Sequence, residues 1–241
     1  MIRFTYLVID LFTLLGPLYL SFPPRSNFYR NWRRVFPAMI ITAGIFVLWD
    51  MWFTRLGVWG FNRDYITGVY LGNLPLEEIL FFICIPYACI FTFFVFPPVK
   101  NMRFSKKNRG IVVVILVALY GAFGLLNYHR RYTLVAFSLL AALHFWAYFI
   151  SKAEWLPRFY LVYALLLIPF LVVNGLLTGT LLAAPVVWYD PRSIMGIRLL
   201  TIPLEDIFYG MSLVLVNLLF LLTGRDGDGA FHNNHQGVAG E

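Results

Sequence analysis

The sequence predicts an all-α integral membrane protein, a bundle of about seven transmembrane helices built from two parallel three-helix repeats joined by a linker helix. Three observations predict this fold: the chain is strongly apolar, its apolar stretches have the length of membrane spans, and one acidic motif occurs twice. Of the 241 residues, 60% are hydrophobic and 13% are charged, and the mean hydropathy is +0.74. Soluble domains carry about 25% charged residues.

The apolar stretches are continuous rather than alternating, which favours membrane-spanning helices of about 20 residues. We expect spans at residues 2–22, 35–54, 75–96, 110–127, 132–151, 159–180 and 203–223. The first stretch contains Asp10 and has no small-residue cleavage site after it, so we expect a retained helix rather than a signal peptide. Cys84 and Cys89 share one span but point in different directions, which indicates core residues rather than a disulfide or a metal site.

The net charge is +7, and the basic residues lie in short runs between the spans. This pattern is typical of a membrane topology signal and not of nucleic-acid binding. The side that includes connections 23–34 and 97–109 carries 12 basic residues, and the other side carries 7. The positive-inside rule therefore predicts a multi-pass protein of the cell membrane with its N-terminus outside and its C-terminus in the cytoplasm.

The acidic motif consists of a proline, one further residue and two adjacent acids at the start of a long apolar run. Its copies are Leu74-Pro75-Leu76-Glu77-Glu78-Ile79-Leu80-Phe81-Phe82 and Ile202-Pro203-Leu204-Glu205-Asp206-Ile207-Phe208-Tyr209. Upstream, the two halves also match at Asp50 and Asn174, at Thr54 and Thr178, and at Val58-Trp59 and Val187-Trp188. The separation is 124 residues at Asp50, 129 at Trp59 and 128 at the acids.

These matches divide the chain into a first three-helix repeat (1–100), a linker helix (101–131), a second three-helix repeat (132–223) and a tail (224–241) that we expect to be disordered. One linker helix gives both repeats the same orientation, so their pseudo-twofold axis should run along the membrane normal. Matched residues should then converge on one central cavity. In the tail, His232 and His235 lack the further ligands of a metal site.

The connections 55–74 and 181–202 are long for a helical bundle, and each precedes one copy of the motif. We expect them to be re-entrant or interfacial segments that cap a site. For the nearby Trp52, Trp59 and Trp188 we favour an interfacial aromatic belt over the cavity lining. No metal-ligating or catalytic partner stands at a suitable spacing from His144, so we expect it to be a hydrogen-bonded core residue.

Ionisable groups within a membrane are costly and mark functional sites. Six of the 12 acidic residues lie in or at the ends of the spans: Asp10, Asp50, Glu77, Glu78, Glu205 and Asp206. A simpler interpretation is that acids in a first helical turn favour the helix dipole. That accounts for one acid in one helix, but less well for a doubled acid that occurs twice and is followed by aromatic residues.

Helical spacing places Glu77 and Glu78 over Phe81 and Phe82, and the second pair over Phe208 and Tyr209. A pair with one protonated and one ionised carboxyl supplies an acid and a base. Aromatic faces stabilise a cation without quenching it. We therefore hypothesise proton-initiated chemistry on an alkene. No dinucleotide- or phosphate-binding motif is present, so we expect neither a redox cofactor nor a metal.

At these residues the chain resembles the membrane lycopene cyclases of the heterodimeric type, which also occur as fused single chains and as a domain of fungal bifunctional carotenoid enzymes. The resemblance covers about residues 1–223, and the chain looks like the fused form. It implies cyclisation of the linear ends of lycopene to β-ionone rings, through γ-carotene to β-carotene, with no net redox change and no cofactor. It also implies a lipophilic carotenoid substrate from the bilayer, with membrane lipids, other carotenoid-pathway enzymes or a second copy as further partners.

The resemblance implies that the motif acids Glu77, Glu78, Glu205 and Asp206 are catalytic, without saying which is donor and which is base. It implies a supporting set as well: Asp50, Thr54, Trp59, Phe81, Phe82, Asn174, Thr178, Phe208 and Tyr209. The main alternative is a proton-coupled small-molecule transporter with parallel three-helix repeats. A third is a carotenoid- or quinone-binding membrane protein without catalysis, which would not need four acids.

Overall fold

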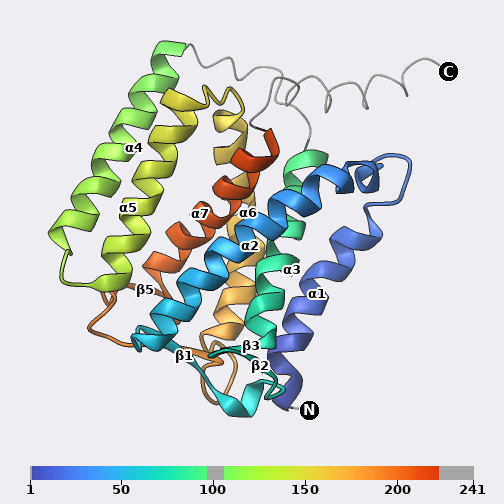
Figure 1. Ribbon diagram of the computed structural model, residues 1–241, viewed down its shortest axis with the longest axis vertical. Helices are drawn as coiled ribbons and strands as arrows, with labels where there is room; N and C mark the ends of the chain where they lie inside the picture. Colours follow the sequence, from blue (N-terminus) through green and yellow to red (C-terminus); the bar gives the residue numbers. More distant parts are fainter. Residues whose placement is uncertain (1, 97–105, 223–241) are drawn as a thin grey trace.

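A computed structural model describes residues 2–96 and 106–222 of the chain and has the all-helical architecture that the sequence predicts (Figure 1). Its helices are α1 (Thr5–Tyr19), α2 (Trp32–Arg55), α3 (Leu76–Val95), α4 (Lys106–Leu126), α5 (Arg131–Phe145), α6 (Leu156–Leu177) and α7 (Leu204–Leu222). Short helical turns occur at Ile2–Phe4, Phe28–Asn31, Arg63–Tyr65 and Trp146–Ile150. The predicted tail, with His232 and His235, lies outside the described residues.

The helices from α2 to α7 are each long and apolar enough to cross a membrane, while the apolar α1 has only 15 residues. Large apolar side chains cover their outer faces, among them Phe12 on α1, Leu125 on α4 and Val172 on α6. So much exposed apolar surface is not tolerated in water. The chain is therefore a multi-pass membrane protein.

In both repeats the first helix packs along the third. Helix α1 lies along α3 and α5 lies along α7, while α4 packs on the outside of α5 (Figure 1). A short hairpin precedes the third helix of each repeat: β2 (Tyr70–Leu71) pairs with β3 (Leu74–Pro75), and β5 (Arg198–Leu199) pairs with β6 (Ile202–Pro203). The predicted three-plus-one-plus-three arrangement is thus observed.

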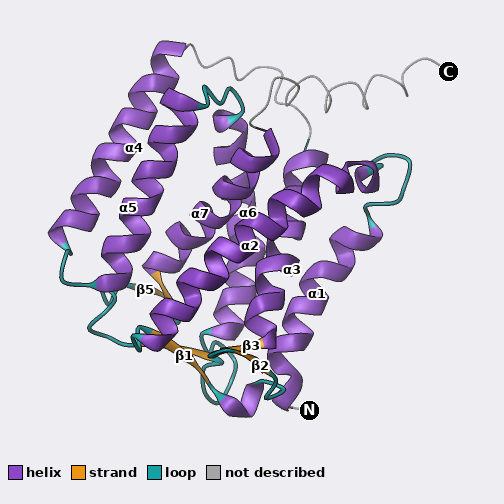
Figure 2. Ribbon diagram, in the orientation of Figure 1, coloured by secondary structure: helices purple, strands orange, loops and turns teal. Residues whose placement is uncertain are grey.

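A third strand pair joins the two repeats at the end of the bundle where all the strands gather (Figure 2). Strand β1 (Trp59–Phe61) runs antiparallel to β4 (Val187–Tyr189), with Gly60 opposite Trp188. Two flanking hydrogen bonds are equivalent: Asn62 N–H donates to Val186 O and Asp190 N–H donates to Val58 O, both at 2.8 Å. The pair is therefore centred on a local twofold axis.

This register corrects one detail of the predicted repeat. Because Val58 and Val186 have equivalent bonds, the separation in the strands is 128 residues. Gly60 therefore corresponds to Trp188, and the predicted match of Trp59 with Trp188 is wrong by one residue. At the helix ends, Val58 N–H donates to Phe53 O and Val186 N–H donates to Leu177 O. Phe53 therefore corresponds to Leu177, which confirms the separation of 124 residues there.

The repeats differ in how closely the middle helix packs. Helix α2 lies along both α3 and α7, whereas α6 touches these helices in fewer places. On α2, Trp49 contacts the ring of Tyr209, with centroids 4.9 Å apart. The equivalent of Trp49 on α6 is the smaller Val173. Smaller side chains on α6 therefore leave space between this helix and the rest of the bundle.

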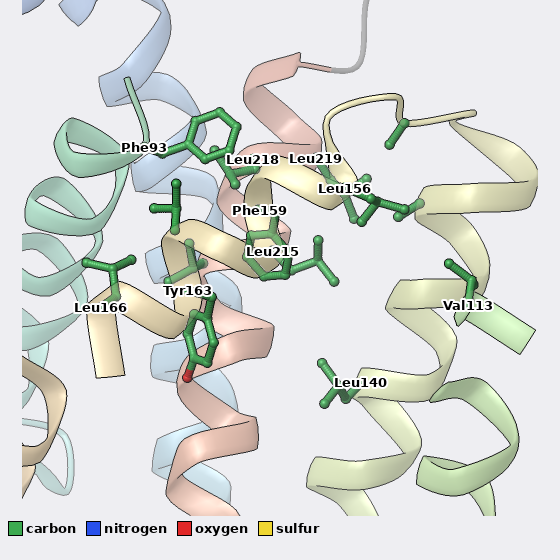
Figure 3. Packing of buried hydrophobic residues seen from close by; sticks show 14 of the residues in the cluster. Phe93, Val113, Leu140, Leu156, Phe159, Tyr163, Leu166, Leu215, Leu218 and Leu219 are labelled. Atoms are coloured by element: carbon green, nitrogen blue, oxygen red, sulfur yellow. The ribbon is translucent and has the colours of Figure 1, made fainter. Parts of the chain in front are cut away.

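A hydrophobic cluster closes the bundle at the end remote from the strands. Figure 3 shows Phe159 and Tyr163 of α6 beside Leu215 and Leu218 of α7, with Phe93 of α3 nearby. These side chains are buried. The space beside α6 thus has a packed floor at this end and the strand-bearing loops at the other.

We expect Gly60→Ala to weaken the pairing of the two repeats. A Cβ atom at residue 60 would overlap the six-membered part of the Trp188 ring, and such overpacking costs about 1–3 kcal/mol. Denaturant unfolding of the purified protein in micelles measures the loss in the free energy of unfolding. Trp188→Ala removes the ring, so adding Gly60→Ala to that variant should lower the free energy of unfolding much less than Gly60→Ala alone. A loss that is the same with and without the Trp188 ring would contradict the contact.

Candidate active site

The space beside α6 is a cavity of about 120 Å³ that is partly open to the surroundings. Most of its lining is apolar or aromatic, and the polar groups gather beneath the strand-bearing loops. The lining comprises side chains of six helices and of both loops, among them Thr13, Asp50, Trp59, Glu78, Phe81, Ile85, Cys89, Tyr132, Tyr163, Phe170, Val173, Asn174, Val187, Tyr189, Asp206 and Tyr209.

Three carboxyl groups converge on this cavity. Glu78 comes from the first repeat, Asp206 from the second, and Asp50 from the end of α2. All three are buried, and Glu78 interacts electrostatically with both Asp50 and Asp206. The site is therefore composite, because neither repeat alone supplies all three groups.

Asp206 receives two phenol hydrogen bonds, one on each oxygen. Tyr132 donates to Oδ1 at 2.8 Å and Tyr189 donates to Oδ2 at 2.9 Å. The two tyrosine rings are stacked, with an angle of 9° between their planes. Burial, and then the neighbouring Asp206 carboxyl, raise the pKa of Tyr189 well above its usual value. This loop tyrosine therefore stays a neutral hydrogen-bond donor.

Glu78 has a related but different environment. Tyr6 donates its phenol hydrogen to Oε2 of Glu78 at 2.6 Å, just as Tyr132 donates to Asp206, and both tyrosines lie in the first turn of a repeat's first helix. A further neighbour of Glu78 is the carboxyl of Asp50, which accepts a hydrogen bond from the indole N–H of Trp59.

The first acid of each pair does not line the cavity. Oε1 of Glu77 accepts from the backbone N–H of Thr67, and Oε1 of Glu205 accepts from that of Met195, both at 2.6 Å. Glu205 also accepts from Thr133 Oγ1 at 2.6 Å. Each of these carboxyl groups thus ties the preceding loop to the first turn of its helix.

The structure brings together about half of the predicted site residues. Those that line the cavity are Asp50, Trp59, Glu78, Phe81, Asn174, Asp206 and Tyr209, whereas Thr54, Glu77, Phe82, Thr178, Glu205 and Phe208 do not. Phe82 packs on Phe46, and Phe208 packs on Phe137. The predicted cap is observed, because both loops contribute side chains to the lining.

Trp59 corrects an expectation. Its side chain is only 6% exposed and reaches into the cavity, so its predicted place in an aromatic belt is wrong. Trp52 and Trp188 are about half exposed, as belt residues are. His144 is buried and its Nδ1 bonds Leu140 O, as predicted.

Sequence reasoning missed the tyrosines that bond the acids. Tyr6, Tyr132 and Tyr189 lie outside the repeated acidic motif. One signal was available, since Tyr6 and Tyr132 occupy matching positions at the start of the first helix of each repeat. Cys84 and Cys89 are free thiols, and in residues 2–96 and 106–222 no three His, Cys, Asp or Glu side chains are arranged so that they could hold a metal ion.

A duplicated helical bundle whose apolar cavity holds acids from both halves defines a class: a membrane protein suited to acid–base chemistry on an apolar molecule. A family model described as lycopene cyclase matches residues 3–96 and 129–223, which are the two repeats. The chain belongs to the lycopene cyclase family.

The bifunctional lycopene cyclase/phytoene synthase of Aspergillus niger is similar to this chain, with 29% identity over 131 residues. The match covers 50% of this chain and 22% of that protein. This chain therefore corresponds to only a small part of that relative's length. No solved structure matches.

We expect Glu77→Ala to loosen the loop before α3, because it removes the acceptor of the Thr67 N–H. An unsatisfied amide costs about 1–3 kcal/mol. Glu77→Gln keeps a carbonyl acceptor and should cost less. Hydrogen exchange at the Thr67 amide, measured by mass spectrometry, should quicken in the alanine variant only.

Thr67→Ala is the matched control, because the Thr67 hydroxyl has no partner among the described residues and the backbone N–H remains. Unchanged exchange in Glu77→Ala would show that this carboxyl does not hold the loop.

Proposed function

We propose that this protein is a carotenoid β-cyclase that converts the linear ends of lycopene to β-ionone rings, giving γ-carotene and then β-carotene. The observation that carries this proposal is the apolar cavity with acids of both repeats beneath its cap. The family membership supports the substrate class. The apolar walls suit a hydrocarbon better than a polar solute, which argues against a transporter of polar small molecules.

The reaction is redox-neutral. A carboxylic acid adds its proton to the terminal double bond, and the next double bond attacks the resulting tertiary cation to close the ring. A carboxylate then removes a proton from the ring. Trp59, Phe81 and Tyr209 lie around the acids and can stabilise the cation through their ring faces.

The four motif acids have two roles in this proposal. Glu78 and Asp206 reach the cavity and handle the protons, with Asp50 beside them. Glu77 and Glu205 are positioning residues that hold the loops in place through Thr67 and Met195. A substrate end enters from the bilayer beside α6 and stops with its terminal double bond beneath the cap.

The domain limits and the orientation are part of this proposal. Repeats at 1–100 and 132–223, joined by the segment 101–131, agree with the two matched family segments. From the excess of basic residues in the connections 23–34 and 97–109 we infer that the cap and the N-terminus lie outside and the C-terminus lies in the cytoplasm.

Expression in bacterial cells that accumulate lycopene tests the activity. We expect β-carotene, identified by chromatography and absorption spectra, because both ends of lycopene can enter the cavity in turn. A product with one ring would restrict the activity to a monocyclase. Unchanged lycopene, with the protein present in the membrane, would refute lycopene cyclisation.

Val173→Trp places on α6 the side chain that α2 has at Trp49 and fills the space that the substrate needs. We expect the rate of ring formation to fall at least about 100-fold, which corresponds to an increase of about 3 kcal/mol in the activation free energy. The protein should remain folded. Val172→Trp is the matched control, because Val172 is 61% exposed on the outer face. Equal activity of the two variants would exclude this cavity as the site.

A further inference from the structure

The two halves of the site share one frame but differ at several places close to the acids, and two of these differences bear directly on how the acids hold a proton. Asp50 in the first repeat corresponds to Asn174 in the second, and both line the cavity. Phe61 in β1 corresponds to Tyr189 in β4 through the strand register. At these two positions the first repeat has an additional carboxyl, and the second has an additional phenol.

In the first repeat these differences favour a bound proton. Glu78 lies beside the carboxyl of Asp50 in a buried setting, and one phenol, that of Tyr6, donates to it. Two adjacent carboxyl groups in a medium of low dielectric constant cannot both be ionised, so they hold one proton between them. Trp59 fixes the Asp50 side of this pair through its indole N–H.

In the second repeat Asp206 has more groups that stabilise its ionised form than Glu78 has. Each oxygen of Asp206 accepts a phenol hydrogen, and the residue equivalent to Asp50 is the neutral Asn174. The guanidinium of Arg198 lies 5.9 Å from the ring centre of Tyr189 and acts electrostatically on Asp206. Donated hydrogen bonds and a nearby cation stabilise a carboxylate.

We propose that the repeats divide the two proton steps: Glu78, which shares a proton with Asp50, is the acid, and Asp206, held by Tyr132 and Tyr189, is the base. This assignment rests on the proposed cyclase function. Tyr132 and Tyr189 are positioning residues, since they act through Asp206.

The proton balance closes without a co-reactant. The proton of the Glu78–Asp50 pair goes to the terminal alkene carbon, and the ring carbon–carbon bond forms at the tertiary cation. Asp206 takes a proton from a ring C–H bond, whose electron pair becomes the ring double bond. Asp206 interacts electrostatically with Glu78 across the cavity. Return of the proton from Asp206 to Glu78 restores the protonated Glu78–Asp50 pair and the ionised Asp206.

This division makes the products of acid and base variants different. Without the acid, no cation forms and the substrate is recovered unchanged. Without a correctly held base, the cation forms but loses a different proton, captures water, or returns its proton. The position of the ring double bond therefore reports on Asp206 and its two tyrosines. A general structural defect would lower the amount of product but would not change this position.

Pigment analysis in lycopene-accumulating cells tests the assignment, with each variant quantified in the membrane fraction. We expect Glu78→Gln and Asp50→Asn to give at least about 100-fold fewer cyclic products, as is typical for loss of a general acid. We expect Asp206→Asn and Tyr189→Phe to give ε- or γ-type rings or hydroxylated ends among their products.

Deuterium exchange separates the roles even where no ring accumulates. With purified protein in deuterated buffer, Asp206→Asn should return lycopene that carries deuterium at the terminal alkene carbon, and Glu78→Gln should return it unlabelled. Label with Glu78→Gln and none with Asp206→Asn would reverse the roles and overturn the proposal. Absence of label and of displaced rings in all variants would overturn it too. If the wild-type protein formed no ring from lycopene, that result would instead refute the cyclase function on which the proposal rests.

Discussion

Burial of two adjacent carboxyl groups at the start of a membrane helix is costly unless donors surround them, and this constraint shapes both repeats. The donors to Glu77 and Glu205 are backbone amides ten residues upstream, at Thr67 and Met195, so each loop must fold back over its helix. The folded loops then lie close enough for β1 and β4 to pair. The cap, the cavity beneath it and the inward orientation of Glu78 and Asp206 all follow from this arrangement.

The sequence predicted the helices well because continuous apolar stretches and a repeated motif are strong local signals. It also predicted that Asp50, Glu78 and Asp206 would converge, since matched residues approach a pseudo-twofold axis. It could not separate Glu78 from Glu77, because that separation depends on where the loop amides lie. Trp59 was misplaced for a related reason: its burial comes from the pairing of β1 with β4 of the other repeat, which no local pattern encodes.

Duplication alone would produce two equal cavities, yet the described cavity lies beside α6. The difference comes from side-chain size: Trp49 and Phe53 of α2 pack on Tyr209 and Trp59, whereas their equivalents Val173 and Leu177 line open space. One repeat therefore has its middle helix packed tightly, and the other gives access to an apolar molecule. The same loss of symmetry separates the environments of Glu78 and Asp206, so that one frame can hold an acid and a base.

The pairing of β1 with β4 also bears on why one chain carries both halves. Each repeat contributes one strand to the cap, and each contributes one of the facing acids. As separate polypeptides, the halves would have to associate in the bilayer before any cavity existed, and the site would depend on their abundance. A covalent link replaces that encounter with a high effective concentration of one half around the other. The linker thereby makes assembly of the site independent of how much protein the membrane contains.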